Sequence, residues 1–303
     1  MQGGQSDGVS TRMLTPPLET AMNPASYIAA GKDANGANIE LHYTDLGSGK
    51  PVVLIHGWPL SAASWEHQLS ELPRHGLRVV AYDRRGFGAS SKPWSGYDYD
   101  HFADDLKAVL DTLDLNDVTL VGFSMGGGEV ARYMSRHGGA RVSRCVFVSA
   151  VPPYLLKTED NPEGVPAEVF EEMKAGILKD RPAFLVDFCK KFYNVTLLSK
   201  PVSEATLAWS AGLAHPASPK ATLDCVDAFS RTDFRADLRA VTVPTLIIHG
   251  SEDQTVPPGV SADHTAKLLP HAEYKVYDGA PHGLNVTHKD ELNADLVRFV
   301  TGT

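Results

Sequence analysis

One serine lies between glycines at the point where an apolar run gives way to a helical pattern, in the segment 121–128 with the sequence VGFSMGGG. A Gly-x-Ser-x-Gly pattern that follows a strand predicts a nucleophile elbow, a sharp turn that exposes the serine hydroxyl. The serine is Ser124, and we expect side chains at Gly122 and Gly126 to collide with neighbouring backbone. Because the pattern also arises by chance in Gly-rich loops, its context must decide.

A serine hydroxyl becomes a useful nucleophile only with a base in hydrogen-bond reach and a third group that fixes that base. In an open parallel sheet, functional groups gather on loops at the carboxyl ends of strands. Asp253 follows the predicted strand Thr245–His249, and His282 follows the predicted strand Glu273–Tyr277. Ser124, Asp253 and His282 are therefore predicted to meet at one sheet edge, in the chain order that α/β-hydrolases use.

Other residues compete for two of these roles. Glu252, next to Asp253, is the alternative orienting acid. His282 is favoured as the base because the other histidines lie inside a predicted strand, on predicted helices or in a helix-to-strand turn: His249, His264, His271 and His288. His56 directly precedes Gly57, a position that suits bracing of a loop better than proton transfer.

An oxyanion that develops during acyl transfer needs two preorganised hydrogen-bond donors. The backbone N–H of Met125, at the start of the helix after Ser124, is one candidate. The loop after the predicted strand Val52–His56 supplies the second, the backbone N–H of Trp58, since Pro59 has no N–H to donate. A core position for the Trp58 indole is compatible with this role, because only the backbone is needed.

Short β-branched runs alternate with stretches of helical period from Ile39 to Ser149, and again from Pro244. This alternation predicts an α/β fold with a mostly parallel central sheet flanked by helices. Residues 27–150 and 235–303 form the predicted core, residues 151–234 a proline-interrupted helical lid, and residues 1–26 a flexible tail rich in Gly, Ser, Thr and Pro. The predicted strands of the core are Val52–His56, Arg78–Tyr82, Thr119–Phe123, Arg144–Ser149, Thr245–His249 and Glu273–Tyr277, and the predicted helices are Trp65–His75, Tyr99–Leu113, Gly127–His137, Ser261–Leu269 and Lys289–Val300.

The composition excludes several classes of protein. The chain has 303 residues, 43% of them hydrophobic, as in ordinary globular proteins, and its net charge of -9 argues against nucleic-acid binding. No apolar run approaches the ~20 residues of a membrane span, and the first 25 residues lack the apolar core of a signal peptide, so we expect a cytoplasmic protein. The three cysteines are too few and too scattered for a disulfide framework or a metal site: Cys145, Cys189 and Cys225.

The basic run DRRGFG at residues 83–88 has no Walker or dinucleotide-binding context. We interpret it as a structural turn, with a local network between Asp83 and the neighbouring arginines.

Four motifs together carry a family resemblance: GWPL at 57–60, DRRGFG at 83–88, GFSMGGGEVARY at 122–133 and APHG at 280–283. They resemble the cofactor-free bacterial haloperoxidases, also called perhydrolases, and the related aryl esterases and γ-lactamases, from about Tyr27 to Phe299. The resemblance implies an α/β-hydrolase fold and a serine-dependent ester hydrolase that works through an acyl-enzyme, without a metal or organic cofactor. It also implies that hydrogen peroxide can replace water and release a peracid, so that halogenation is a secondary reaction of that peracid.

Pro59 is the residue that we expect to select between water and hydrogen peroxide as the molecule that accepts the acyl group. Proline biases the residue before it toward an extended conformation, and we expect it to direct the Trp58 carbonyl into the site, where a peroxide hydrogen finds an acceptor. The expected partners are a small-molecule ester and hydrogen peroxide, and a homo-oligomer stays open. The alternative activity is γ-lactam or amide hydrolysis, and a non-catalytic ligand receptor on the same fold is a further, less favoured alternative.

Overall fold

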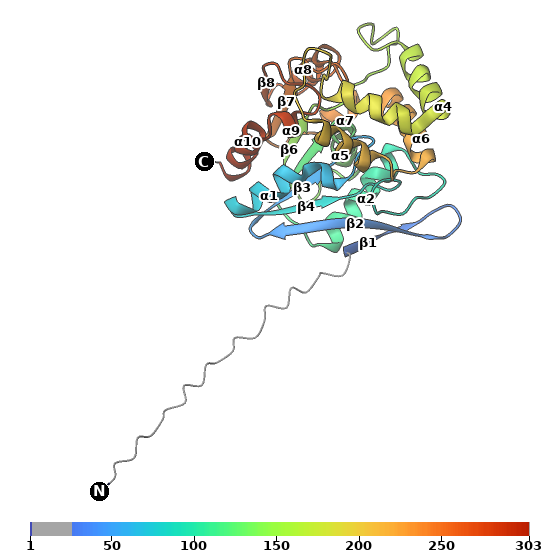
Figure 1. The fold of residues 1–303 in the computed structure, drawn as a ribbon. Coiled ribbons are helices and arrows are strands. Elements are labelled where there is room, and N and C mark those ends of the chain that lie inside the picture. The colour runs from blue at the N-terminus through green and yellow to red at the C-terminus, as the bar shows by residue number, and fades with distance from the viewer. Residues whose placement is uncertain (2–25, 303) are drawn as a thin grey trace.

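The computed structural model describes Met1 and residues 26–302. Eight strands form one sheet, in the order β1-β2-β4-β3-β5-β6-β7-β8 (Figure 1). From β4 to β8 all neighbouring strands run parallel, whereas β1 and β2 pair antiparallel. The predicted mostly parallel sheet is therefore confirmed. The strands are β1 (Ser26–Lys32), β2 (Asn38–Gly47), β3 (Lys50–Ile55), β4 (Leu77–Tyr82), β5 (Val118–Phe123), β6 (Val142–Val148), β7 (Thr245–Gly250) and β8 (Glu273–Tyr277).

The central strands are buried on both faces. Every residue of β5 and β7 is buried, as are the last four residues of β3. Parallel strands that are covered by helices on both sides consist of continuous apolar runs. This is why the sequence located these strands to within two residues at each end.

Strands β1 and β2 were not predicted from the sequence. Only Ile39 and Leu41 are buried in β2, and its other side chains are half-buried or exposed, so the apolar signal is short. Strand β1 begins at Ser26, which the prediction assigned to the N-terminal tail. Apart from Met1, the rest of that predicted tail lies outside the described residues.

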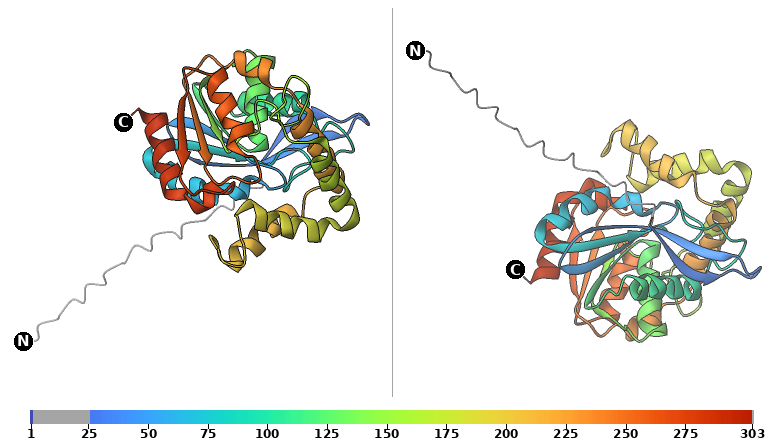
Figure 2. Two further views of the ribbon diagram at one scale, coloured as in Figure 1. Left: turned by 90° about the horizontal axis from the view of Figure 1, so that it is seen from above. Right: turned by 90° about the horizontal axis from the view of Figure 1, so that it is seen from below.

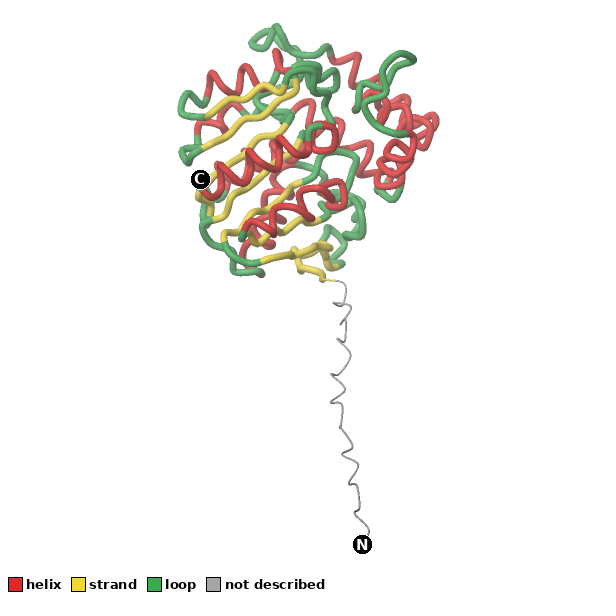
Figure 3. The backbone as a smooth tube through the Cα atoms, turned by 60° about the vertical axis from the view of Figure 1, so that its left-hand side comes forward, coloured by secondary structure: helices red, strands yellow, loops and turns green. Residues whose placement is uncertain are grey.

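Helices cover both faces of the sheet (Figure 2). Figure 3 shows the strands, in yellow, between the helices, in red. Helices α2, α3, α7 and α8 pack together on one face, and α1, α9 and α10 on the other. The predicted helix Trp65–His75 is not continuous: Trp65 ends a 3-10 turn, Glu66–Glu71 is α-helical, and Leu72–His75 is a second 3-10 turn. Pro73 accounts for the second of these breaks, because it has no backbone N–H to continue the α-helix. The helices (α) and 3-10 turns (η) outside residues 151–234 are η1 (Ala62–Trp65), α1 (Glu66–Glu71), η2 (Leu72–His75), α2 (Tyr99–Thr112), α3 (Met125–Arg136), α7 (Arg235–Arg239), η3 (Pro258–Val260), α8 (Ala262–Leu268), α9 (Leu284–Thr287) and α10 (Lys289–Thr301).

The inserted segment, residues 151–234, connects β6 to α7 and β7 and carries α4 (Ala167–Phe192), α5 (Glu204–Ala214) and α6 (Pro219–Arg231). In Figure 2 these helices, yellow to light orange, lie outside the two layers that cover the sheet. Helix α4 is broken at Asp180, whose backbone is non-helical, two residues before Pro182. The carboxylate of Asp180 accepts a hydrogen bond from Ala183 N–H and so caps the second arm of α4.

Candidate active site

Ser124 occupies a strained turn between β5 and α3. Its φ of 54° and ψ of -119° place it outside the ordinary regions for a residue with a side chain. A Cβ on Gly122 would lie 2.5 Å from the carbonyl oxygen of Gly126, and a Cβ on Gly126 would lie 2.4 Å from that of Ile55. A side chain at either glycine would therefore collide with neighbouring backbone, as expected from the sequence. The local geometry is that of a nucleophile elbow.

The structure brings Ser124, His282 and Asp253 together in one hydrogen-bonded chain. Nε2 of His282 is 2.9 Å from Oγ of Ser124, and Nδ1 of His282 is 2.6 Å from Oδ2 of Asp253. All three side chains are buried. Ser124 follows β5, Asp253 follows β7 and His282 follows β8, so the carboxyl ends of three parallel strands supply the three groups.

Asp253 is held by four contacts. Its Oδ1 accepts hydrogen bonds from the backbone N–H groups of Thr255 (2.9 Å) and Val256 (2.8 Å), while Oδ2 faces two histidines. Burial by itself raises the pKa of Asp253, but attraction to His282 and hydrogen bonds from the two histidines outweigh it and hold that pKa well below its usual range. The carboxylate is therefore ionised and fixed in direction. Glu252, the alternative acid, is exposed.

The second histidine beside Asp253 is His249, which sequence reasoning set aside because it lies inside a strand. The strand position is correct, since His249 belongs to β7. Its Nε2 is 2.8 Å from the carbonyl oxygen of Val256 and 3.2 Å from Oδ2 of Asp253, because the turn after β7 folds back over the strand end. The four-residue spacing of His249 and Asp253 across a tight turn is the signal that could have indicated this contact.

The two predicted oxyanion donors are backbone N–H groups of residues beside the cavity. Trp58 and Met125 both line the cavity that reaches Ser124. Within residues 26–302, no acceptor takes a hydrogen bond from the backbone N–H of either residue. The Trp58 indole donates to the carbonyl oxygen of Thr222 and packs against Phe184 and Phe188 of α4, so it fills the core as well. Pro59 follows it, and the Trp58–Pro59 peptide bond is cis.

His56 braces the loop that carries Trp58. Its Nδ1–H donates to the carbonyl oxygen of Gly57 (2.9 Å), and its Nε2 accepts from the backbone N–H of Arg84 (3.0 Å). Burial, together with the nearby Arg84 charge, lowers the pKa of His56 to about 3. The imidazole is therefore neutral, with both nitrogens engaged, as a bracing role requires.

The predicted local pairing of Asp83 with its neighbouring arginines is wrong. Arg84 pairs with Glu129 on α3 at 2.7 Å, and Arg85 pairs with Asp105 on α2 through two contacts of 2.6 Å. Asp83 instead accepts from the backbone N–H groups of Ala62 and Ala89 and contacts His42. The arginines diverge because they follow β4 directly, beneath helices that present acids of their own.

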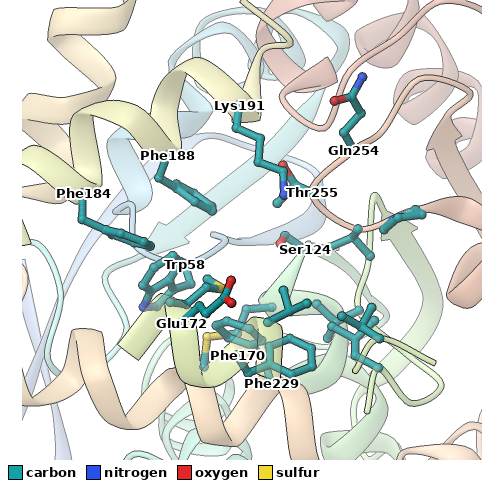
Figure 4. A pocket seen from close by; sticks show the side chains of 18 of the residues that line it. Trp58, Ser124, Phe170, Glu172, Phe184, Phe188, Lys191, Phe229, Gln254 and Thr255 are labelled. Atoms are coloured by element: carbon teal, nitrogen blue, oxygen red, sulfur yellow. The ribbon is translucent and has the colours of Figure 1, made fainter. Parts of the chain in front are cut away.

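A cavity of about 490 Å³ extends from Ser124 to the inserted segment (Figure 4). This size is within the range of small-molecule sites. Glu172, Lys191 and Gln254 add polar groups to its lining. Its wall is mostly apolar and comes from both arms of α4, from α6 and from the loop after β3, with Phe170, Met173, Phe184, Phe188, Phe229 and Trp58 as the main contributors.

Among Met1 and residues 26–302, no three His, Cys, Asp or Glu side chains gather where they could hold a metal ion. In the same residues, no helix combines the length and apolar character that crossing a membrane requires. The three cysteines are buried and form no disulfide.

The sequence profile of the α/β hydrolase fold matches residues 50–289. The chain belongs to this family. It is 44% identical to a non-heme chloroperoxidase from Kitasatospora aureofaciens over 264 residues, which are 86% of this chain and 96% of that protein. Against a bifunctional esterase/perhydrolase from Acinetobacter calcoaceticus the identity is 40%, with 86% and 96% of the two chains covered.

The crystal structure of a bromoperoxidase from Bacillus anthracis superposes with a TM-score of 0.88 at 50% identity, covering 92% of this chain and all of that one. The resemblance to cofactor-free haloperoxidases, perhydrolases and esterases is therefore confirmed.

Proposed function

We propose that this protein is a serine-dependent carboxylic ester hydrolase that also transfers acyl groups to hydrogen peroxide. One observation carries the proposal: a continuous hydrogen-bonded chain from Ser124 through His282 to Asp253, at the end of an apolar cavity of small-molecule size. Ser124 is the nucleophile, His282 the general base and acid, and Asp253 the group that orients the base. The substrate is a small-molecule ester, and the site uses only groups of the chain itself.

Acylation follows from the geometry. As Oγ of Ser124 attacks the ester carbonyl, Nε2 of His282, 2.9 Å away, takes the hydroxyl proton. The carbonyl oxygen becomes an oxyanion that accepts hydrogen bonds from the backbone N–H groups of Trp58 and Met125. His282 then protonates the leaving alkoxide, and an acyl-enzyme on Ser124 is left. The ionised Asp253 stabilises the imidazolium that exists between these steps.

Deacylation decides the product. Water or hydrogen peroxide attacks the acyl-enzyme carbonyl, His282 accepts the attacker's proton, and Ser124 leaves with that proton returned to its oxygen. Water yields a carboxylic acid and peroxide yields a peracid. The name of the Acinetobacter calcoaceticus relative, a bifunctional esterase/perhydrolase, supports the second route, and the names of the chloroperoxidase and bromoperoxidase relatives are consistent with halide oxidation by a peracid.

The decisive experiment is a rapid-mixing assay with p-nitrophenyl acetate, butyrate and octanoate, each with and without hydrogen peroxide. We expect a p-nitrophenol burst equal to the enzyme concentration, and Ser124→Ala should lower turnover by about 10⁶-fold. Anilides and γ-lactams in the same panel measure the amidase alternative. Binding of these esters without turnover by the wild type would instead identify a ligand receptor, and full activity of Ser124→Ala would overturn the assignment of the nucleophile.

A further inference from the structure

An arginine without any exposed surface lies directly behind the loop that carries Trp58. Arg84 follows β4 and is fully buried, as is its partner Glu129. Its Nε–H donates to Oε2 of Glu129 at 2.7 Å, and its Nη2–H donates to the carbonyl oxygen of His56 at 2.9 Å. The guanidinium therefore bridges helix α3 and the end of strand β3.

The backbone of Arg84 makes a further contact to the same loop, and this contact leads to Trp58. The Arg84 N–H donates to Nε2 of His56, which requires the His56 proton to sit on Nδ1. That Nδ1–H donates to the carbonyl oxygen of Gly57. The Gly57 carbonyl and the Trp58 N–H belong to one planar peptide unit and point in opposite directions. Fixing the carbonyl therefore fixes the direction of the Trp58 N–H, and polarises it as a donor.

The side chain of Arg84 also reaches the other predicted donor. Glu129 lies one turn after Met125 on α3, so a contact that holds Glu129 also holds the N-terminal turn of that helix. The hydroxyl of Tyr82, at the end of β4, also donates to Glu129. Arg84 and Tyr82 thus tie α3 to the strand end from which the Trp58 loop is also held. One buried network joins the two halves of the oxyanion hole.

Stability alone does not account for such a network. A buried Arg–Glu pair gains little over well-packed apolar side chains, because both ions lose their hydration. In addition, Nη1 of Arg84 has no hydrogen-bond partner among the described residues. What the ion pair does provide is a fixed direction for groups that contact it, since the guanidinium fork accepts few geometries.

We propose that Arg84 is a positioning residue of the oxyanion hole: through His56 it directs the Trp58 N–H, and through Glu129 it holds the helix that presents the Met125 N–H. The inference rests on the ester-hydrolase function proposed above. Arg84 does not touch the substrate and acts only through these two residues. Losing it therefore weakens binding of the tetrahedral transition state more than binding of the planar ester.

The chain offers a matched control for the test. Arg85 and Asp105 form a second buried ion pair, one residue further along the chain. Within residues 26–302, neither side chain hydrogen-bonds to the Trp58 loop or to α3. We compare Arg84→Met/Glu129→Leu with Arg85→Met/Asp105→Leu, so that each variant loses one buried pair and leaves no unpaired charge. Unfolding temperature, kcat, KM and the inhibition constant of phenylboronic acid, which forms a tetrahedral adduct with an active serine, are measured for both.

In the Arg84→Met/Glu129→Leu variant, we expect kcat to fall by about tenfold or more and the inhibition constant of phenylboronic acid to rise by a similar factor. KM should change by less than about threefold. The Arg85→Met/Asp105→Leu variant should have a lower unfolding temperature, but it should not lose kcat and boronate affinity while KM stays nearly constant. Equal kinetic losses in the two variants, or an unchanged kcat and boronate affinity in the Arg84 variant, would overturn the inference.

A second pair of variants keeps the test open if the Arg84 variant does not fold. His56→Leu removes the donor to Gly57, whereas His56→Asn retains an amide N–H near the place of Nδ1. We expect the loss of kcat and of boronate affinity in His56→Leu and partial recovery in His56→Asn, and equal values in the two variants would count against the inference. A wild type that releases no p-nitrophenol from any of the esters contradicts the ester-hydrolase proposal itself, which separates the two failures.

Discussion

The ring of Phe192 packs edge-on against the imidazole of His282, with ring centroids 4.9 Å apart. Phe192 is the last residue of α4, and its carbonyl oxygen accepts a hydrogen bond from Gly283 N–H at 3.0 Å. The inserted segment therefore contacts the proposed base directly, through both a ring and a backbone hydrogen bond. The walls of the cavity and the orientation of His282 depend on the same helix.

Replacing Phe192 should affect chemistry as well as stability. We expect Phe192→Ala to lower the free energy of unfolding by about 3–5 kcal/mol, as for other buried aromatic truncations. Because the imidazole loses one wall, kcat should fall by about tenfold or more. Chemical denaturation and steady-state kinetics check both, with Leu110→Ala in α2 as a core variant remote from the site. If the two variants showed the same kcat, Phe192 would have no role in placing His282.

Pro59 should control the partition between water and peroxide. We expect Pro59→Leu to lower the ratio of perhydrolysis to hydrolysis, since the Trp58 carbonyl would no longer be directed toward the acceptor by a proline. The measurement compares peracetic acid formation with p-nitrophenyl acetate hydrolysis in wild type and variant. An unchanged ratio, whatever the absolute rates, would rule out this role for Pro59.

The low pKa of Asp253 predicts how stability depends on pH. Although burial acts in the other direction, the two histidines depress this pKa in the folded state. A depressed folded pKa stabilises the protein above the unfolded value of about 3.9, and that stabilisation is lost as the pH falls through the folded pKa. Wild type should therefore exceed Asp253→Asn in stability at neutral pH, and the gap should begin to narrow below about pH 5 and continue to narrow below about pH 3. Thermal unfolding across this range tests the sign, and a gap independent of pH would contradict it.

Gly126 should be the least replaceable glycine near Ser124. A Cβ at this position would approach the Ile55 carbonyl oxygen at 2.4 Å, so Gly126→Ala should separate α3 from β3 and cost more than about 3 kcal/mol of stability along with most of the activity. Gly212, inside α5, has open space around it and serves as the control. Gly212→Ala should be neutral or stabilising by up to about 1 kcal/mol. Comparable unfolding free energies for the two variants would disprove the close-approach argument.

Local sequence was enough for the parts of the site that lie at strand ends. The strands before Ser124, Asp253 and His282 are continuous apolar runs, and parallel pairing brings their carboxyl ends together without further information. The contact of His249 with Asp253 was missed because it depends on how tightly one turn closes. The partners of Arg84 and Arg85 lie 45 and 20 residues away in the chain, on helices whose rotation no local pattern reveals.

The break at Asp180 divides α4 into two arms, and side chains from both arms face the cavity. The groups proposed to carry out the reaction all belong to the sheet core, whereas most of the wall around a substrate comes from these two arms. Substrate range can therefore be redesigned by exchanging residues such as Phe170, Met173, Phe184 and Phe188, without altering any group that moves a proton. The end of the second arm is the exception, because a change at Phe192 would alter reactivity and selectivity together.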